Sequence, residues 1–139
     1  MKLIGRTVNR GKAKGEAIVS RIPFSFLGEL DPSTGKICSP SHELFGQSLK
    51  DKILVCPTGK GSSGGPNVAY LAKKGGNMPR AMIMKEIEPV LAAAILTADI
   101  PAIDRLDQDP LECIETGDYL EMDADQGIVE VIKKNSPQI

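Results

Sequence analysis

The most constraining feature of the sequence is a short apolar run followed by a loop rich in glycine and serine and then by a helical pattern. Residues 52–57 read Lys-Ile-Leu-Val-Cys-Pro, residues 58–65 read Thr-Gly-Lys-Gly-Ser-Ser-Gly-Gly, and residues 66–74 place apolar side chains at helical spacing. The pair Gly75-Gly76 then precedes a second apolar run, residues 81–84. This order predicts a buried strand, a loop, a helix and a parallel strand joined in a right-handed crossover.

The segments on either side of this unit predict more strands and one more helix. We expect two strands at residues 5–9 and 16–22, joined by a turn, and a hairpin formed by residues 119–122 and 128–132. Residues 89–97 should form a helix that is apolar nearly all round and therefore well buried, and residues 100–103 a short strand. We therefore expect an α/β fold in which residues 1–139 form a single domain. Its core would span about residues 5–133, with a flexible tail at residues 134–139.

Charge and composition exclude two classes of protein. The chain has 17 Lys and Arg against 18 Asp and Glu, and only 4% of its residues are aromatic. A nucleic-acid-binding protein normally has a basic patch and stacking aromatic side chains, so we expect no nucleic acid partner. No apolar run approaches the roughly 20 residues that span a bilayer, and the N-terminus lacks a signal-peptide pattern. We expect a cytoplasmic protein with no membrane partner.

The three cysteines, Cys38, Cys56 and Cys113, are far apart in the sequence. Their odd number and the lack of any CxxC motif argue against a disulfide framework and against a zinc site. We expect no metal to be bound by this chain alone.

The loop at residues 59–65 is the strongest candidate for a functional site. Glycines let a backbone approach a ligand closely, and the start of a helix offers unpaired N–H groups with partial positive charge. The loop therefore predicts a phosphate or carboxylate site. It is not a P-loop, which requires GxxxxGK[ST], because Lys60 is followed by Gly61. Ser62 or Ser63 has three interpretations: a helix cap, an anion ligand, or an activated base or nucleophile.

Residues 23–50 show no pattern of a helix or strand. So long a loop is unusual in a small domain, and such loops are often functional. The alternative is a structural loop held in place by Phe24 and Phe26. His42, the only histidine of the chain, lies in this segment, so a Ser–His pair stays open.

Several short motifs share an order and a spacing with one known family. They run from about Gly5 to Lys133 and are Ser25-Phe26-Leu27-Gly28, Asp31-Pro32-x-Thr34-Gly35, His42, Gly46-Gln47-Ser48, Lys52-Ile53-Leu54-Val55, Gly59-Lys60-Gly61-Ser62-Ser63 and Ile100-Pro101-Ala102-Ile103-Asp104. Together they resemble the small subunit of the aconitase X family.

The resemblance implies a fold, a partner and a cofactor. The fold would be a swivelling β/β/α domain like the mobile domain of aconitase. The partner would be a large catalytic subunit, forming a heterodimer, and the 4Fe–4S cluster would lie on that subunit. We also expect residues 23–50 to line the cleft between the two subunits.

The resemblance also implies roles for particular residues. Aconitases carry a Gly-Ser-Ser-Arg motif whose first serine accepts the substrate proton, and that serine corresponds to Ser62. Gly64 stands where aconitase has its substrate-binding arginine, and Glu29 stands where a second glycine is expected after Gly28. The implied substrate-binding residues are Gly61, Ser63, Gly64, Lys60, Ser25 and His42.

The implied reaction is removal of water from a small hydroxy acid. The first hypothesis is dehydration of (R)-5-phosphomevalonate to trans-anhydromevalonate 5-phosphate in the archaeal-type mevalonate pathway. The alternative within the family is dehydration of cis-3-hydroxy-L-proline. The departing hydroxyl needs a Lewis acid, which the cluster iron would supply, and the weakly acidic proton needs a strong base. A serine alkoxide stabilised by the N–H groups of residues 61–65 would be such a base.

Two further interpretations stay open. The chain could be a swivelling phosphate-binding or carrier module with His42 as the phosphoryl acceptor. It could also be a purely structural subunit in which Ser62 only caps a helix.

Overall fold

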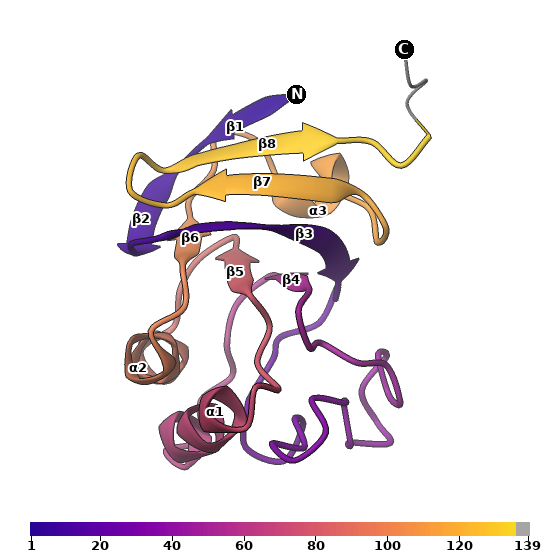
Figure 1. The fold of residues 1–139 in the computed structure, drawn as a ribbon, viewed down its shortest axis with the longest axis vertical. Helices are drawn as coiled ribbons and strands as arrows, with labels where there is room; N and C mark the ends of the chain where they lie inside the picture. The colour runs from indigo at the N-terminus through magenta and orange to yellow at the C-terminus, as the bar shows by residue number, and fades with distance from the viewer. Residues whose placement is uncertain (136–139) are drawn as a thin grey trace.

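In the computed structural model, which describes residues 1–135, two layers of strands and one layer of helices are stacked on one another (Figure 1). The elements in chain order are β1 (Lys2–Ile4), β2 (Arg6–Asn9), β3 (Lys12–Val19), β4 (Ile53–Cys56), α1 (Gly65–Lys74), β5 (Ala81–Met84), α2 (Pro89–Ala98), β6 (Ala102–Asp104), α3 (Pro110–Cys113), β7 (Tyr119–Asp123) and β8 (Ile128–Ile132). The expected β/β/α arrangement is confirmed.

β3 belongs to both strand layers. Its first part, Lys12–Glu16, pairs antiparallel with β7, and its last part, Ala17–Val19, pairs parallel with β4. The strand order is β1-β8-β7-β3-β4-β5-β6-β2, and β4, β5 and β6 run parallel to one another. The predicted β–α–β unit is therefore present, and α2 adds a second one.

The N-terminal segment closes this sheet on itself. β1 pairs with β8 at one end of the strand order, and β2 pairs with β6 at the other, although only Gly5 separates β1 from β2. A Cβ on Gly5 would lie 2.5 Å from the carbonyl oxygen of Asp104, so only glycine fits where the segment bends between the two layers.

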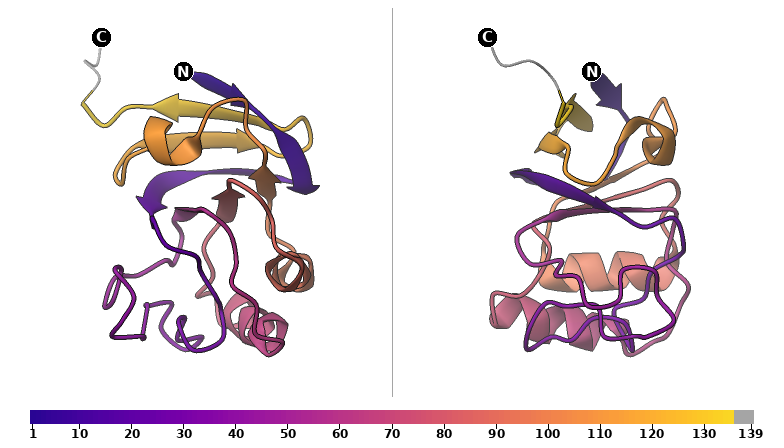
Figure 2. Two further views of the ribbon diagram at one scale, coloured as in Figure 1. Left: turned by 180° about the vertical axis from the view of Figure 1, so that it is seen from behind. Right: turned by 90° about the vertical axis from the view of Figure 1, so that its right-hand side faces the viewer.

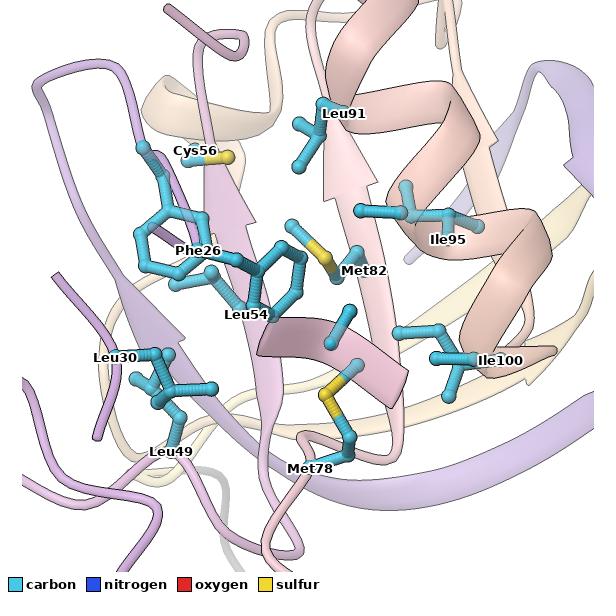
Figure 3. Close-up of a cluster of buried hydrophobic side chains, with 14 of the residues drawn as sticks. Phe26, Leu30, Leu49, Leu54, Cys56, Met78, Met82, Leu91, Ile95 and Ile100 are labelled. Atoms are coloured by element: carbon cyan, nitrogen blue, oxygen red, sulfur yellow. The ribbon is translucent and has the colours of Figure 1, made fainter. Parts of the chain in front are cut away.

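Two hydrophobic cores result because side chains on successive strand positions point to opposite faces. On β4, Ile53 and Val55 point between the two strand layers, whereas Leu54 and Cys56 point toward the helices. All four are buried, which explains the continuous apolar run of this strand. Figure 3 shows the helix-side core, where Leu54 and Cys56 lie near Phe26.

The segment between β3 and β4 contains no helix or strand, as expected, and it lies beside the helices in the third layer (Figure 2). It contributes apolar side chains to the helix-side core: Phe24, Phe26, Leu30, Ile37, Leu44 and Leu49. The segment therefore covers the part of the sheet that α1 and α2 leave open.

Most predicted elements are present, with changes at their ends. β4, β5 and the β7–β8 hairpin lie where the sequence predicts them. β3 begins earlier than expected, at Lys12, because its first half pairs with β7. β1 and α3 were not predicted. The predicted tail, residues 134–139, lies mostly outside the described residues.

Both predicted helices are present, but the burial of α2 differs from the prediction. α2 is only half buried: Leu91 and Ile95 lie in the core, whereas Leu96 is 58% exposed. On α1 the buried side chains are Ala69 and Ala72, and Leu71 is exposed. None of the helices in residues 1–135 is long and apolar enough to span a membrane.

Candidate active site

The glycine- and serine-rich loop lies at the carboxyl end of β4 and leads into α1. Ligands of α/β proteins typically bind at this end of the parallel strands. α1 begins at Gly65 with Gly64 as its N-cap, and no side chain caps the helix. Of the three interpretations of Ser62 or Ser63, the helix cap is therefore wrong. Both serines are exposed instead.

Ser62 has an unusual backbone conformation. Its φ is +81°, next to Gly61 at +89°, and this left-handed region costs a residue with a Cβ about 1 kcal/mol or more. The Gly65 N–H donates to the Ser62 carbonyl at 3.0 Å and helps to hold the turn. Within residues 1–135, the backbone N–H groups of Ser62, Ser63 and Gly64 have no hydrogen-bond acceptor. An exposed hydroxyl thus stands beside unpaired donors.

The entry to the loop passes very close to α2. A Cβ on Gly59 would lie 2.5 Å from Glu88 Oε1 and 2.7 Å from Leu91 Cβ. Glu88 is held in place because its carboxylate caps α2, accepting the N–H groups of Val90 and Leu91 at 2.8 and 2.9 Å. The loop therefore leaves β4 along a path that only glycine allows.

Ser25 connects the long segment of residues 23–50 to the loop of the candidate site. Its hydroxyl lies 3.2 Å from the carbonyl oxygens of both Gly61 and Leu27 and can donate to either. The neighbouring Phe24 N–H donates to the Thr58 carbonyl at 3.0 Å. Ser25 is buried, so in this structure its hydroxyl supports the loop and does not face solvent.

Glu29 is a buried carboxylate next to the same loop. It is 5% exposed, Oε1 accepts the Ser25 N–H at 2.8 Å, and Oε2 forms an ion pair with the Lys60 ammonium. Lys60 is therefore directed toward Glu29. Its own side chain remains about half exposed, at 48%. This role of Glu29 was not predicted from the sequence. The only sign of it was that a glutamate stands at a position where the family resemblance implies glycine.

His42 is buried behind Glu29. Its Nδ1 accepts the Leu44 N–H at 3.0 Å, which places the proton of the neutral ring on Nε2. Nε2 is 4.0 Å from Glu29 Oε1, beyond hydrogen-bond distance, and has no partner among the described residues. The ring packs edge-on against Phe24, with centroids 6.3 Å apart. No hydrogen bond in residues 1–135 joins His42 to Ser62 or Ser63, so a Ser–His pair is not formed.

The cysteines do not come together. Burial raises the pKa of the Cys56 thiol to about 12, and the negative charge of Glu29 adds to the effect, so this thiol is protonated. Cys38 is exposed and Cys113 is half-buried elsewhere. In the part of the chain that the structure describes, no three His, Cys, Asp or Glu side chains could hold a metal ion. These residues do not fit an iron–sulfur cluster.

A charged network at the same edge of the sheet was not predicted. Asp104, fully buried at the end of β6, accepts two hydrogen bonds from Arg6 at 2.9 and 2.8 Å and one from the Ile87 N–H at 2.9 Å. Burial alone would raise the pKa of Asp104, but these donors and the positive charges of Arg6 and Arg105 together hold it below its ordinary value. The network joins the ends of β5 and β6 to the N-terminal segment.

Within residues 1–135, the predicted site residues do not enclose a substrate pocket. The cavity lined by Ser25, Gly61 and Gly65 has a volume of about 10 Å³, room for a single water at most. Pockets for small molecules are typically about 300–1,000 Å³. Ser62 and Ser63 do not line this cavity and are exposed to solvent, so a substrate would have to reach them from outside the domain.

A family model described as the aconitase X swivel domain matches residues 2–131. The chain belongs to the aconitase X swivel domain family. The resemblance found in the short motifs is confirmed.

Relatives of this swivel domain match it over nearly its whole length. A protein of Methanosarcina acetivorans named phosphomevalonate dehydratase small subunit is 43% identical over 139 residues, which is 100% of this chain and 96% of the relative. A protein of the same name from Thermococcus kodakarensis is 45% identical over 133 residues, covering 96% and 98% of the two chains.

The fold of the swivel domain also matches solved structures. The crystal structure of Thermococcus kodakaraensis aconitase X in its holo-form has a TM-score of 0.90 and 44% sequence identity, covering 96% of this chain and 99% of that one. A solution NMR structure of a UPF0107 protein has a TM-score of 0.87 and 38% identity, covering 96% and 100%.

Proposed function

We propose that this swivel domain is the small subunit of a phosphomevalonate dehydratase, a hydro-lyase that converts (R)-5-phosphomevalonate to trans-anhydromevalonate 5-phosphate. The observation that carries the proposal is the identity of 43% and 45% to full-length relatives with that name. Activity would require the large subunit, on which we place the 4Fe–4S cluster.

Ser62 is the proposed proton acceptor. Its left-handed backbone sets the hydroxyl at an exposed turn, beside the unpaired N–H groups of Ser63 and Gly64. A serine is a strong base only as an alkoxide, and donors fixed in advance around the oxygen favour that charge. The Ser62 alkoxide would take the proton from the carbon next to the substrate carboxylate and would become the hydroxyl.

The substrate carries two anionic groups, a carboxylate and a phosphate. With Gly64 in the position of the aconitase arginine, the positive charge must come from elsewhere. We assign this role to the N–H groups of Ser62, Ser63 and Gly64, just before α1, and to the Lys60 ammonium. Gly61, which has no side chain, would allow the substrate to come close to the backbone of the loop. The Ser25 hydroxyl supports the loop by its contact with the Gly61 carbonyl.

The open face of the loop supports the need for a partner. The cavity under Gly61 holds no more than one water, and Ser62 and Ser63 lie on the outside of the domain. We propose that the large subunit covers this face and completes the pocket, with residues 23–50 lining the cleft.

Ser62→Ala in the reconstituted pair of subunits is the main test. We expect turnover to be lost, with binding to the large subunit and the free energy of unfolding nearly unchanged, because Ser62 caps no helix. Ser63→Ala is the comparison variant: this adjacent, exposed serine is implied in substrate binding, so its loss should raise KM without abolishing turnover. Retention of more than a tenth of the activity by Ser62→Ala would rule out Ser62 as the base.

The substrate requires a separate assay. The same reconstituted pair should dehydrate (R)-5-phosphomevalonate and leave cis-3-hydroxy-L-proline unchanged. The opposite preference would place the chain in the hydroxyproline branch of the family, without changing the role of Ser62.

A phosphoryl carrier is less well supported. The side chain of His42 is fully buried, and Nδ1 is occupied by the Leu44 N–H, so a phosphoryl donor could reach neither nitrogen without opening the core. Incubation with a phosphoryl donor should therefore leave His42 unlabelled.

A further inference from the structure

The side chain of His42 has an unused hydrogen-bond donor in the protein interior. Buried polar side-chain atoms are nearly always paired, because losing water without gaining a partner is unfavourable. Nε2–H is fully buried, has no partner among residues 1–135, and lies 4.0 Å from Glu29 Oε1. A movement of about 1 Å would bring the two atoms to hydrogen-bond distance. The His42 Nε2–H group therefore lies next to a carboxylate oxygen that could accept its hydrogen bond.

Glu29 has one permanent partner and one that can leave. Its Oε1 accepts the backbone N–H of Ser25, which is fixed within the buried loop segment. Its Oε2 is paired with Lys60, whose long side chain is 48% exposed and rises from the loop that carries the proposed base. Lys60 can therefore turn toward solvent, whereas the Glu29 carboxylate cannot.

A buried carboxylate cannot lose its cation without compensation. The charge would be left desolvated, which strongly disfavours the change unless another donor takes the place of the ammonium. His42 Nε2–H is such a donor, and Oε1 has a second lone pair available beside the Ser25 N–H. The nearby Cys56 thiol stays protonated and adds no second negative charge to this interior.

We propose that Glu29 is a positioning residue that exchanges Lys60 for His42 when substrate binds. This inference rests on the proposed function, since it assigns a task to Lys60 in that site. In the free subunit, Glu29 holds the Lys60 ammonium back from the loop face. When the carboxylate or phosphate of the substrate arrives, Lys60 moves to it, and Glu29 accepts the hydrogen bond from His42.

The exchange predicts opposite effects on KM for two partners of one ion pair. In the reconstituted enzyme, Lys60→Met should raise KM for (R)-5-phosphomevalonate about tenfold or more, because a charge-assisted contact with the substrate is lost. Glu29→Gln should lower KM, because the lysine no longer has to leave a charged partner. The double variant should match Lys60→Met. If both single variants raised KM alike, the exchange would be wrong.

His42 offers a pair of substitutions that separate its two nitrogens. In His42→Asn the amide oxygen can still accept the Leu44 N–H, but no donor faces Glu29, so KM should rise. In His42→Gln the amide nitrogen lies near the position of Nε2 and should restore part of the loss. An equal KM for the two variants would contradict the proposal. Lys74→Met, at the far end of α1, is a control for the loss of a surface charge.

An NMR measurement on the small subunit alone tests the exchange at Glu29 independently of the proposed enzymatic function. In Lys60→Met, Glu29 should turn to His42, so the Nε2–H proton should shift downfield in the NMR spectrum and exchange more slowly with water than in Lys74→Met. An unchanged Nε2–H signal would overturn the exchange even if the enzyme dehydrates (R)-5-phosphomevalonate. A shifted signal in a chain whose reconstituted pair shows no such activity would overturn only the proposed function.

Discussion

The side chain of Leu27 lies against the α-carbon of Gly64, so that a Cβ on Gly64 would be 2.9 Å from Leu27 Cδ2. Leu27 thus occupies space that the side chain of an arginine at this position would need. The backbone is not the obstacle, because Gly64 has φ −78° and ψ −7°, which any residue can adopt.

The first prediction concerns this contact. Gly64→Arg should fold, with a free energy of unfolding within about 1 kcal/mol of the wild type, because Leu27 is 44% exposed and its flexible end can move aside. Urea unfolding measures the change. Leu27→Ala together with Gly64→Arg should recover any loss, and a loss of several kcal/mol that the double variant does not recover would contradict this account.

The second prediction concerns the strain at Ser62. Ser62→Gly should raise the free energy of unfolding by about 1 kcal/mol, because glycine adopts φ +81° without a steric penalty. Ser62→Ala should leave it nearly unchanged, because Cβ remains. Urea unfolding of the two variants separates backbone strain from the chemistry of the hydroxyl. Equal stability of the glycine and alanine variants would show that no strain is held there.

The third prediction concerns two glycines of the same loop. Gly59→Ala should lower the free energy of unfolding by about 2 kcal/mol, since its Cβ would meet Glu88 and the Cβ of Leu91, neither of which can withdraw freely. Gly65→Ala is the matched control: its nearest neighbour would be 3.7 Å away, and alanine favours the helix, so it should be neutral or slightly stabilising. Thermal unfolding of both variants tests the contrast.

The fourth prediction concerns pH and Asp104. The pKa of this carboxyl is lowered in the folded protein from its ordinary value of 3.8, so its stabilising effect is complete above that value and is lost as the pH falls through the folded pKa. Asp104→Asn should lower the free energy of unfolding by about 2 kcal/mol at pH 7 and make it less dependent on pH below 4. Urea unfolding across this range gives both quantities.

A substitution on the surface is the control for this pH effect. Glu112→Gln, exposed on α3, should keep the pH dependence of the wild type. If Asp104→Asn showed the same slope against pH as the wild type, the network with Arg6 would not be the origin of the acid sensitivity.

The strands and helices of the central unit could be predicted because their signals are local. The apolar run of β4 is continuous because both faces of that strand are buried, and Gly75 ends α1 as its position suggests. β1 could not be predicted, because three residues carry little pattern and its partner β8 lies at the other end of the chain. The burial of α2 was overestimated because an apolar sequence does not reveal which side the sheet will cover.

The candidate site was predictable in part. The loop around Ser62 could be found from its glycines and its place between a strand and a helix. The fixed carboxylate of Glu29 could not, because its partner Lys60 lies in another loop and its neighbour His42 lies far along the same patternless segment. The conformation of Ser62 was also hidden, since its left-handed φ depends on the turn that Gly61 begins.

The bend at Gly5 has a consequence for how the chain is made. β1 and β2 are separated by one residue, yet their pairing partners β8 and β6 come about a hundred residues later in the chain. Until β8 has been synthesised, the nascent polypeptide must keep these edges unpaired, which is the condition that invites aggregation. Folding of this domain should therefore be completed only once β8 is available, and chaperones should bind the nascent domain while β1 is still unpaired.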